Sequence, residues 1–126
     1  KAETVKKYGE EQVMLWRRSY DVAPPNGESL KDTYNRCVPY FKETVMGELK
    51  NGKTVILSGH HNSLRAIIKY LDNISDQDIV KVNIPYCIPL VYEFDDRLTP
   101  IKHYYLAQDE EVRQVIESIK NQTKRV

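Results

Sequence analysis

The chain has 126 residues, the size of one domain or of part of one, and 40% of them are apolar, which is enough for a core. Its formal net charge of +1 gives no general attraction to nucleic acid or to a membrane, and no apolar run approaches the length of a membrane span. No signal peptide is visible, and Cys37 and Cys87 lack metal-ligand spacing. We therefore expect reduced thiols in a cytoplasmic protein, although a disulfide between the two stays open.

Helix-forming sequence opens the chain. Residues 2–8 and 10–18 have few helix breakers, and Gly9 between them marks an interruption. The sequence therefore predicts two consecutive helices, followed by a loop over residues 19–28.

A long helix is predicted after this loop. Ser29, with Asp32 three positions later, is typical of a capped helix start. Pro39 inside this helix should bend it or mark a break. The apolar face of the helix is spaced at steps of three and four residues: Leu30, Tyr34, Cys37, Val38, Phe41, Val45 and Leu49.

A buried strand is predicted next. The turn dipeptide Asn51-Gly52 leads into the run Thr54-Val55-Ile56-Leu57, which indicates a strand over residues 53–58. The later elements follow from apolar periodicity, capping residues and turn signals. They are a helix over 63–72, a short helix over 76–81 after Ser75, strands over 88–94 and 101–105 joined as a hairpin, a helix over 109–120, and a frayed basic tail over 121–126.

Three strands are few for this many helices. A parallel strand over residues 53–58 needs neighbours and cover on both faces, and the sequence offers no other fully apolar strand. This imbalance favours an incomplete sheet. The first residue is Lys1 rather than Met, so we also expect that a part of the protein upstream of it is absent.

The stretch from Ser58 to Arg65 carries the clearest chemical signal. It places His60, His61 and Asn62 between a predicted strand end and a helix start, where open α/β sheets bind ligands. Free backbone N–H groups of the first helical turn favour an anion there. His60 then either binds a phosphoryl group and carries a proton, or simply caps the turn.

The other basic residues have both a functional and a structural interpretation. Arg17 and Arg18 close the second helix, where cations offset the helix dipole, but at a helix end both can also turn to one anion. His61 and Asn62 suit either a ligand or ordinary turn chemistry. For Arg65, a solvated or structurally paired side chain is the favoured interpretation.

Several other site classes lack their motifs in this sequence. The histidines and carboxylates have no metal-binding spacing, there is no glycine-rich phosphate loop, and there is no Gly-x-Ser-x-Gly elbow. We therefore expect no metal site.

Several motifs along the chain together carry a family resemblance. They are Lys1-Ala2-Glu3-Thr4 with Tyr8-Gly9, Trp16-Arg17-Arg18-Ser19-Tyr20-Asp21 with Pro24-Pro25, Glu28-Ser29-Leu30-Lys31-Asp32-Thr33, His60 with Asn62-Ser63-Leu64-Arg65, Asn83-Ile84-Pro85, and Pro89-Leu90-Val91-Tyr92-Glu93. In these motifs the chain resembles the C-terminal part of the 2,3-bisphosphoglycerate-dependent phosphoglycerate mutases, a family of the histidine phosphatase superfamily. The resemblance covers nearly the whole chain.

The resemblance implies roles for six residues. His60 matches the second active-site histidine, which holds the transferring phosphoryl group, and Asn62 matches a substrate contact. His61 stands where the family usually has a glycine that contacts substrate through its backbone. The pair that grips the phosphate and carboxylate of the substrate is matched by Arg17 and Arg18, and a substrate-contacting lysine by Lys1.

This sequence also departs from the family. The Leu-Arg-His-Gly motif, whose histidine becomes phosphorylated, is absent, as are the acid/base glutamate and another phosphate-binding arginine. Besides His61, Tyr86-Cys87 replaces a common Thr-Gly pair, and the loop over 22–28 is short.

The implied fold is the C-terminal portion of a three-layer α/β fold with a mostly parallel central sheet, with residues 1–126 as a partial domain. The implied whole protein is a cytoplasmic isomerase of glycolysis and gluconeogenesis that interconverts 3-phosphoglycerate and 2-phosphoglycerate through a phosphohistidine. It would be primed by 2,3-bisphosphoglycerate without metal, bind neither nucleic acid nor membrane, and form a homo-oligomer.

We expect the 126 residues alone to be inactive. The alternatives are a phosphatase or bisphosphoglycerate-forming relative, and a non-catalytic half that complements a separate N-terminal piece.

Overall fold

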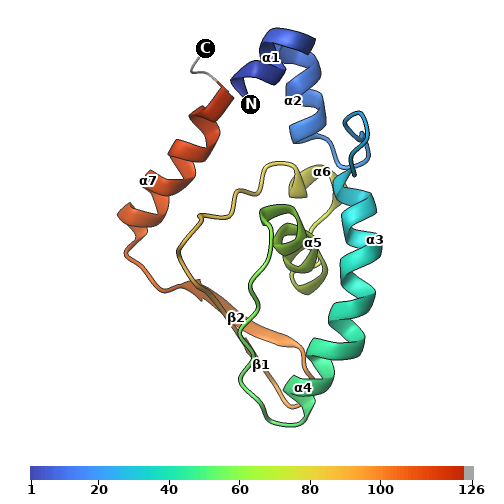
Figure 1. Cartoon of the computed structure of the whole chain (residues 1–126). Helices are drawn as coiled ribbons and strands as arrows, with labels where there is room; N and C mark the ends of the chain where they lie inside the picture. The colour runs from blue at the N-terminus through green and yellow to red at the C-terminus, as the bar shows by residue number, and fades with distance from the viewer. Residues whose placement is uncertain (124–126) are drawn as a thin grey trace.

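Two helices open the structure, a computed structural model that describes residues 1–123 (Figure 1). Helix α1 (Ala2–Tyr8) and helix α2 (Glu10–Arg18) meet at Gly9, as the sequence predicts. Gly9 has a φ of 85°, a backbone conformation that other residues adopt only with strain. Tyr8 and Trp16 pack edge to face across this corner, with ring centroids 5.1 Å apart.

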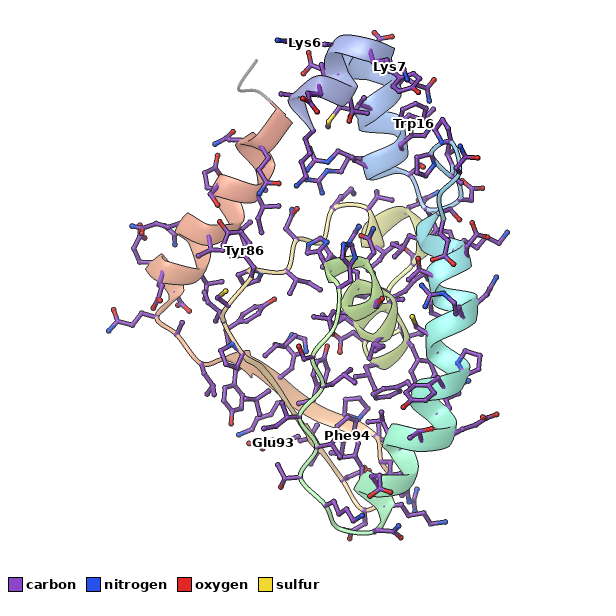
Figure 2. All side chains as sticks on the ribbon, viewed as in Figure 1. Lys6, Lys7, Trp16, Tyr86, Glu93 and Phe94 are labelled. Atoms are coloured by element: carbon purple, nitrogen blue, oxygen red, sulfur yellow. The ribbon has the colours of Figure 1, made fainter. Side chains whose placement is uncertain are left out.

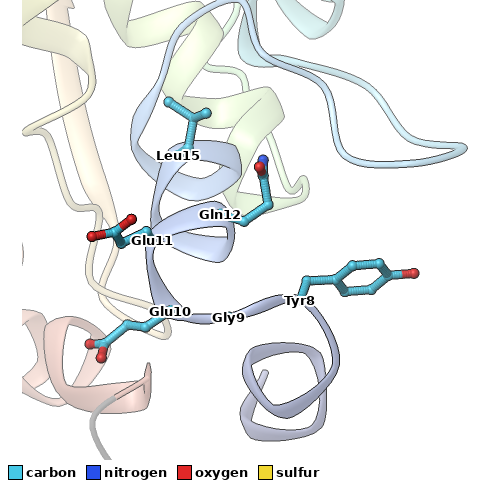
Figure 3. A pocket seen from close by; sticks show the side chains of 6 residues that line it. All are labelled: Tyr8, Gly9, Glu10, Glu11, Gln12 and Leu15. Carbon is cyan, nitrogen blue, oxygen red and sulfur yellow. The ribbon is translucent and has the colours of Figure 1, made fainter.

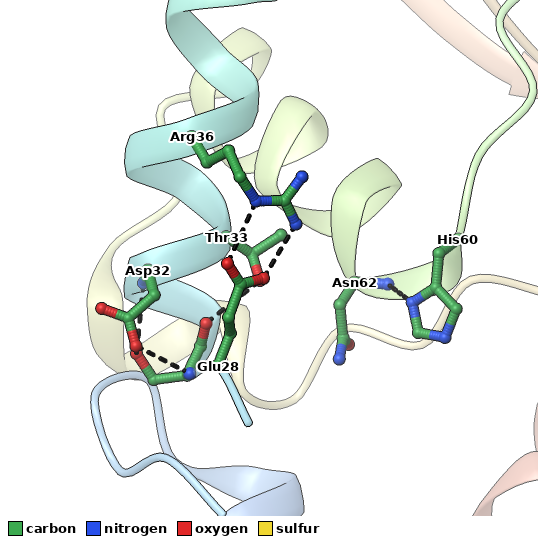
Figure 4. A network of polar contacts seen from close by, with 7 residues as sticks. Glu28, Asp32, Thr33, Arg36, His60 and Asn62 are labelled. Atoms are coloured by element: carbon green, nitrogen blue, oxygen red, sulfur yellow. Dashed lines mark hydrogen bonds and ion pairs between the residues drawn. The ribbon is translucent and has the colours of Figure 1, made fainter. Parts of the chain in front are cut away.

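The predicted capped start of the long helix is confirmed. In α3 (Leu30–Tyr40) the Ser29 hydroxyl accepts the backbone N–H of Asp32 at 3.1 Å, and the Asp32 carboxylate accepts the backbone N–H of Ser29 at 2.9 Å (Figure 4). The predicted apolar face is confirmed as well. Its four buried members are Leu30, Val38, Phe41 and Val45, and its half-buried members are Tyr34, Cys37 and Leu49.

Pro39 changes the type of helix without ending it. A π-helical segment, Phe41–Val45, follows α3 directly and continues into α4 (Met46–Lys50). The backbone N–H of Met46 donates to the carbonyl of Phe41, the wider spacing of a π-helix. Proline has no N–H for the carbonyl one turn back and its ring crowds that carbonyl, which accounts for an irregularity close by.

The strand predicted over residues 53–58 is wrong for this chain. Residues 53–60 have no regular secondary structure, and the side chain of Ile56 is 94% exposed. Within residues 1–123 no strand pairs with this segment, and the amides of 54–60 donate no backbone hydrogen bond. An apolar run becomes a strand only when a neighbouring strand pairs with it.

Helix α5 (His61–Leu71) packs against α3 and carries the core. Buried Leu30, Ala66 and Ile79 meet there, and they join α3 and α5 to the short helix α6 (Asp76–Ile79). Helix α5 begins two residues earlier than predicted because His60 caps it, and α6 ends two residues earlier than predicted. Ser75 caps α6 as expected.

The predicted hairpin is confirmed as strands β1 (Leu90–Phe94) and β2 (Pro100–Tyr105), which pair antiparallel. Asp72 at the end of α5 ties the hairpin to the core. Its carboxylate accepts the Tyr92 hydroxyl at 2.9 Å and lies 3.2 Å from Nδ1 of His103. The sheet within residues 1–123 has only these two strands, so the expected mostly parallel central sheet is not formed there.

Helix α7 (Asp109–Lys120) stands apart from α5 in the view of Figure 1. Its far end returns to the start of the chain, where Nζ of Lys1 donates to Oε1 of Gln122. Figure 2 shows Tyr86 directed toward α7, and its hydroxyl lies 3.1 Å from Oγ of Ser118.

Part of the predicted frayed tail, Asn121–Thr123, is a 3₁₀ turn, and residues 124–126 lie outside the described residues. None of the helices within residues 1–123 has the length and apolarity that crossing a membrane requires.

Candidate functional site

His60 is the N-cap of α5. Its Nδ1 accepts the backbone N–H of Asn62 at 3.3 Å, so the structural interpretation of His60, a turn cap, is correct (Figure 4). A ring that accepts through Nδ1 carries its proton on Nε2 when it is neutral. The residue is exposed, so this N–H remains available to an acceptor outside the chain. Capping and phosphoryl binding therefore use different ring nitrogens and are compatible.

His61 is the first residue of α5 and is half-buried. Its Nε2 accepts the backbone N–H of Ile84 at 3.5 Å, which joins the start of α5 to the loop before β1. Burial, and next the nearby Arg65 guanidinium, lower the pKa of His61 below its usual value of about 6.5. His61 is therefore neutral at pH 7, which suits its role as an acceptor.

Arg17 and Arg18 lie at the last turn of α2, and both side chains are half-buried. Nη1 of Arg18 donates to the carbonyl of Val80 at 3.3 Å. Burial and the adjacent Arg18 lower the pKa of Arg17, and burial and Arg17 lower the pKa of Lys1. The three basic side chains therefore lie in one region, although Lys1 precedes α1 and the two arginines end α2.

Arg65 is buried, with 4% of its surface exposed, so a solvated side chain is ruled out and the structurally paired interpretation is correct. Its Nη2 donates to the carbonyl of Ile79 at 2.5 Å, and its Nη1 donates to Oδ1 of Asn62 at 3.4 Å. Burial, and next the Arg18 guanidinium, lower the pKa of Arg65 to about 10. It still carries its charge at neutral pH.

Four of these side chains form one set, which we call the cation group: Lys1, Arg17, Arg18 and Arg65. The charged neighbours that lower the pKa of Lys1, Arg17, His61 and Arg65 are cations or the imidazole of His60. No ion pair between residues 1–123 includes a member of the group, whereas Arg36 pairs with Glu28 at 2.8 Å. Converging cations without carboxylate partners are typical of sites that bind anions, which makes this region the candidate functional site.

All six residues that the sequence singled out belong to this one region. His60, His61 and Asn62 lie at its edge, at the start of α5, and Lys1, Arg17 and Arg18 are members of the cation group. Sequence reasoning missed the anchors, which are the backbone carbonyls of Ile79 and Val80 and the backbone N–H of Ile84. Backbone groups leave no signal in residue type, so only the folded chain reveals them.

Two hollows on the surface lie away from the cation group. One surrounds Gly9 and is lined by Glu10 and Glu11, whose charges disfavour a phosphorylated ligand (Figure 3). The other lies between β2 and α7. Within residues 1–123, no cluster of three or more His, Cys, Asp or Glu side chains has the arrangement of a metal site.

Cys87 has an unusual backbone conformation. Its φ is 61°, in the left-handed region that favours glycine. Cys87 is exposed, and both it and Cys37 are free thiols. The sequence comparison with the family pointed to this position, because a glycine is common there.

The sequence model of the histidine phosphatase superfamily (branch 1) matches residues 1–106, and the chain belongs to this superfamily. Among its relatives is the 2,3-bisphosphoglycerate-dependent phosphoglycerate mutase of Borreliella afzelii (strain PKo), identical at 44% of 149 aligned positions. The protein of the same name from Borrelia garinii subsp. bavariensis (strain ATCC BAA-2496 / DSM 23469 / PBi) is also identical at 44% of 149 positions. Each alignment covers 98% of this chain and 60% of the relative, so the chain spans about three fifths of the length of these relatives.

Proposed function

We propose that the whole protein is a phosphoglycerate mutase that interconverts 3-phosphoglycerate and 2-phosphoglycerate through a phosphohistidine. The observation that carries this proposal is the cation group, which gathers Arg17, Arg18 and Lys1 near His60 and His61 with no carboxylate partner among residues 1–123. A small substrate with a phosphate and a carboxylate needs several convergent cations. The names of the relatives and the superfamily match agree with this assignment.

In this proposal the residues of the chain bind, orient and stabilise charge. Arg17 and Arg18 grip the phosphate and carboxylate of the substrate, Lys1 adds a third cation, and Asn62 donates to the substrate through its amide. His60 donates its Nε2–H to the phosphoryl group in transit, where preorganised donors stabilise developing charge. His61 contributes through its backbone N–H and holds the loop before β1 by its ring.

The chemistry of the proposed cofactor fits the cation group. 2,3-Bisphosphoglycerate is a polyanion, and the four basic side chains Lys1, Arg17, Arg18 and Arg65 are not neutralised by carboxylates of residues 1–123. When bound, the cofactor supplies the phosphoryl group that primes the nucleophilic histidine. Of the residues described here, Lys1, Arg17 and Arg18 would hold it.

The nucleophile and the acid/base glutamate are proposed to come from a part of the protein outside these 126 residues, since the chain has no Leu-Arg-His-Gly motif. The same part would supply the neighbours of residues 53–58 and complete a mostly parallel central sheet in a three-layer fold. The whole protein is then a cytoplasmic homo-oligomer that binds no nucleic acid and no membrane. The intact mass of the natural protein, measured together with its activity, tests whether one longer polypeptide carries both parts.

The direct test of the function is conversion of 3-phosphoglycerate by the full-length protein, with 2,3-bisphosphoglycerate and with EDTA present. We expect turnover that survives EDTA and no turnover by the purified 126-residue chain.

In the full-length protein, His60→Asn and His60→Ala should both lower kcat about 10²- to 10⁴-fold, the usual contribution of a positioned proton donor. Asn also caps helices well, so only His60→Ala should lose stability, by about 1 kcal/mol. Full activity of His60→Asn would show that His60 is only a cap.

A second candidate function is a phosphatase or bisphosphoglycerate-forming relative. The observation that favours it is the His61 ring, which fixes the loop carrying Tyr86 and Cys87 beside the site. That loop and ring occupy positions where the family has smaller residues, so access of water or of a second acid to the phosphoryl group can differ. Analysis of the products of the full-length protein separates the candidates, because a phosphatase releases inorganic phosphate and a mutase does not.

A further inference from the structure

Arg65 is a buried cation whose partners are all neutral. Only 4% of its surface is exposed, yet none of the ion pairs within residues 1–123 includes it, and its Nε has no hydrogen-bond partner there. Burying a charge without an opposite charge is costly, and an apolar residue of the same length avoids that cost. The position therefore calls for a reason beyond packing.

The hydrogen bonds of Arg65 connect it to Asn62 and place it next to Arg18, which are both residues of the anion site. Its Nη1 donates to Oδ1 of Asn62, one turn earlier on α5, at 3.4 Å. Its Nη2 donates to the carbonyl of Ile79, and Nη1 of Arg18 donates to the next carbonyl along the chain, that of Val80, at 3.3 Å. The end of α6 therefore holds two guanidinium groups side by side on neutral acceptors, which leave their charges intact.

The hydrogen bond from Arg65 determines the orientation of the Asn62 side-chain amide. An asparagine side chain has an acceptor oxygen and a donor NH₂ group, and rotation by half a turn exchanges them. Because Oδ1 faces a guanidinium that can only donate, the NH₂ group is left to face outward. An outward donor is what an anionic ligand requires, whereas an outward oxygen would repel it.

We propose that Arg65 is a positioning residue of the anion site, which orients the amide of Asn62 so that its N–H groups face the ligand. The inference rests on the proposed function in that the ligand used to test it is 3-phosphoglycerate. Arg65 does not touch the ligand, because it is buried behind Asn62 and its two terminal nitrogens are engaged by Asn62 and Ile79.

The test is the dissociation constant of 3-phosphoglycerate, measured by calorimetry on the full-length protein and its variants. We expect Arg65→Met to weaken binding about tenfold, the effect of losing one well-placed hydrogen bond to a charged group. Asn62→Ala should weaken binding by a similar factor. In the Asn62→Ala background, Arg65→Met should have a much smaller effect, because the amide that Arg65 orients is gone.

Lys69→Met is the matched control. Lys69 lies one turn further along α5, and its side chain is 11% exposed. Its Nζ donates to the carbonyl of Ile74 at 2.7 Å and pairs with the Asp76 carboxylate at 2.9 Å. This variant removes a largely buried cation from the same helix without a contact to Asn62, so it should lower stability but leave the dissociation constant unchanged. Arg65→Lys is the second variant, which retains a cation for folding but cannot reach both acceptors, so its binding should also be weakened.

Three results would overturn the inference: unchanged binding in Arg65→Met or Arg65→Lys, equal effects of Arg65→Met with and without Asn62, or equal weakening in Lys69→Met. These results leave the proposed function intact, since the unaltered protein still binds the ligand. Absence of 3-phosphoglycerate binding by the unaltered full-length protein would overturn both the proposed function and this inference.

Discussion

The imidazoles of His60 and His61 are neighbours in sequence but lie in different surroundings. His60 is exposed and accepts a hydrogen bond through Nδ1, which leaves Nε2 directed away from the helix cap. His61 is half-buried, accepts through Nε2 and has Arg65 close by. A single step along the backbone therefore separates a ring suited to donate to a phosphoryl group from a ring that is held neutral.

The lowered pKa of His61 predicts a loss of stability in mild acid. The unfolded chain has the ordinary histidine pKa of about 6.5, and the folded chain has a lower one, so below pH 6.5 the unfolded state binds more protons. The free energy of unfolding should therefore fall as the pH drops from about 6.5 toward the pKa that His61 has in the folded chain. Well above pH 6.5, His61 should contribute no pH dependence. Urea unfolding of the full-length protein at a series of pH values measures this.

The matched variant for this experiment is His61→Gln, whose side-chain oxygen can still accept the N–H of Ile84. The decline in stability below pH 6.5 should be shallower in His61→Gln than in the unaltered protein. Curves that run parallel over this range would show that His61 does not titrate differently in the two states.

Cys87 has a backbone conformation that costs free energy for any residue with a Cβ atom, about 1–2 kcal/mol. Cys87→Gly should stabilise the protein by about 0.5–1 kcal/mol, because glycine relieves this strain but loses more backbone entropy on folding. Cys87→Ala removes the thiol and keeps the strain, so its stability should stay within about 0.5 kcal/mol of the unaltered protein. A gain in Cys87→Ala equal to that in Cys87→Gly would assign the effect to the thiol.

Among the elements, α3 is the support on which the site rests. Its buried Leu30 meets Ala66 of α5 and Ile79 of α6, and these two helices carry Asn62, Arg65 and the Ile79 carbonyl of the candidate site. The reciprocal hydrogen bonds of Ser29 and Asp32 fix where α3 begins. Loss of this cap is expected to weaken the packing of α3 against α5 and α6. It removes no side chain of the candidate site.

Removing the cap should therefore change stability without changing affinity. Ser29→Ala should lower the free energy of unfolding by about 1 kcal/mol, the usual cost of losing an N-cap hydroxyl. Ser29→Thr keeps a hydroxyl at the same position and is the control, with most of the stability retained. A changed dissociation constant for 3-phosphoglycerate in Ser29→Ala would show that the cap also shapes the site.

The helices and the hairpin were predictable because their signals are local. The cap of Ser29, the glycine break at Gly9 and the three-and-four spacing of the α3 face act between residues a few positions apart. The π-helical segment after Pro39 was predicted only as a bend or break. The hydrogen-bond pattern that forms after a proline depends on tertiary packing, here that of Phe41 and Val45, which are both buried.

For the molecule as a whole, the exposed segment 53–60 is the feature most in need of an explanation. It contains apolar residues, it leads to His60, and its amides at 54–60 donate no backbone hydrogen bond within residues 1–123. Unpaired backbone groups next to apolar side chains are the template for pairing with another strand. Strand β2 and the residue after it also expose the apolar side chains of Ile101, Tyr104 and Leu106.

Hydrogen exchange of the backbone amides tests whether the rest of the protein pairs with this segment. In the 126-residue chain, amides 54–60 should exchange at rates close to those of an unstructured peptide, while those of α5 are slower. In the full-length protein the same amides should be protected. Fast exchange in the full-length protein would contradict the proposed completion of the sheet, and protection in the short chain would contradict its exposed state.

The sequence alone determined the superfamily and the order of the helices and the hairpin, because motif spacing and periodicity are properties of neighbouring residues. It also named six candidate site residues, whose roles stay predictions. It identified His60 as a cap or a ligand and Arg65 as solvated or paired without deciding either. The tertiary structure decided that His60 caps α5 and that Arg65 is buried against Asn62 and Ile79. It also showed that residues 53–58 form no strand within this chain. Burial, pairing and convergence of charge depend on residues distant in sequence, so they are settled only when the chain folds.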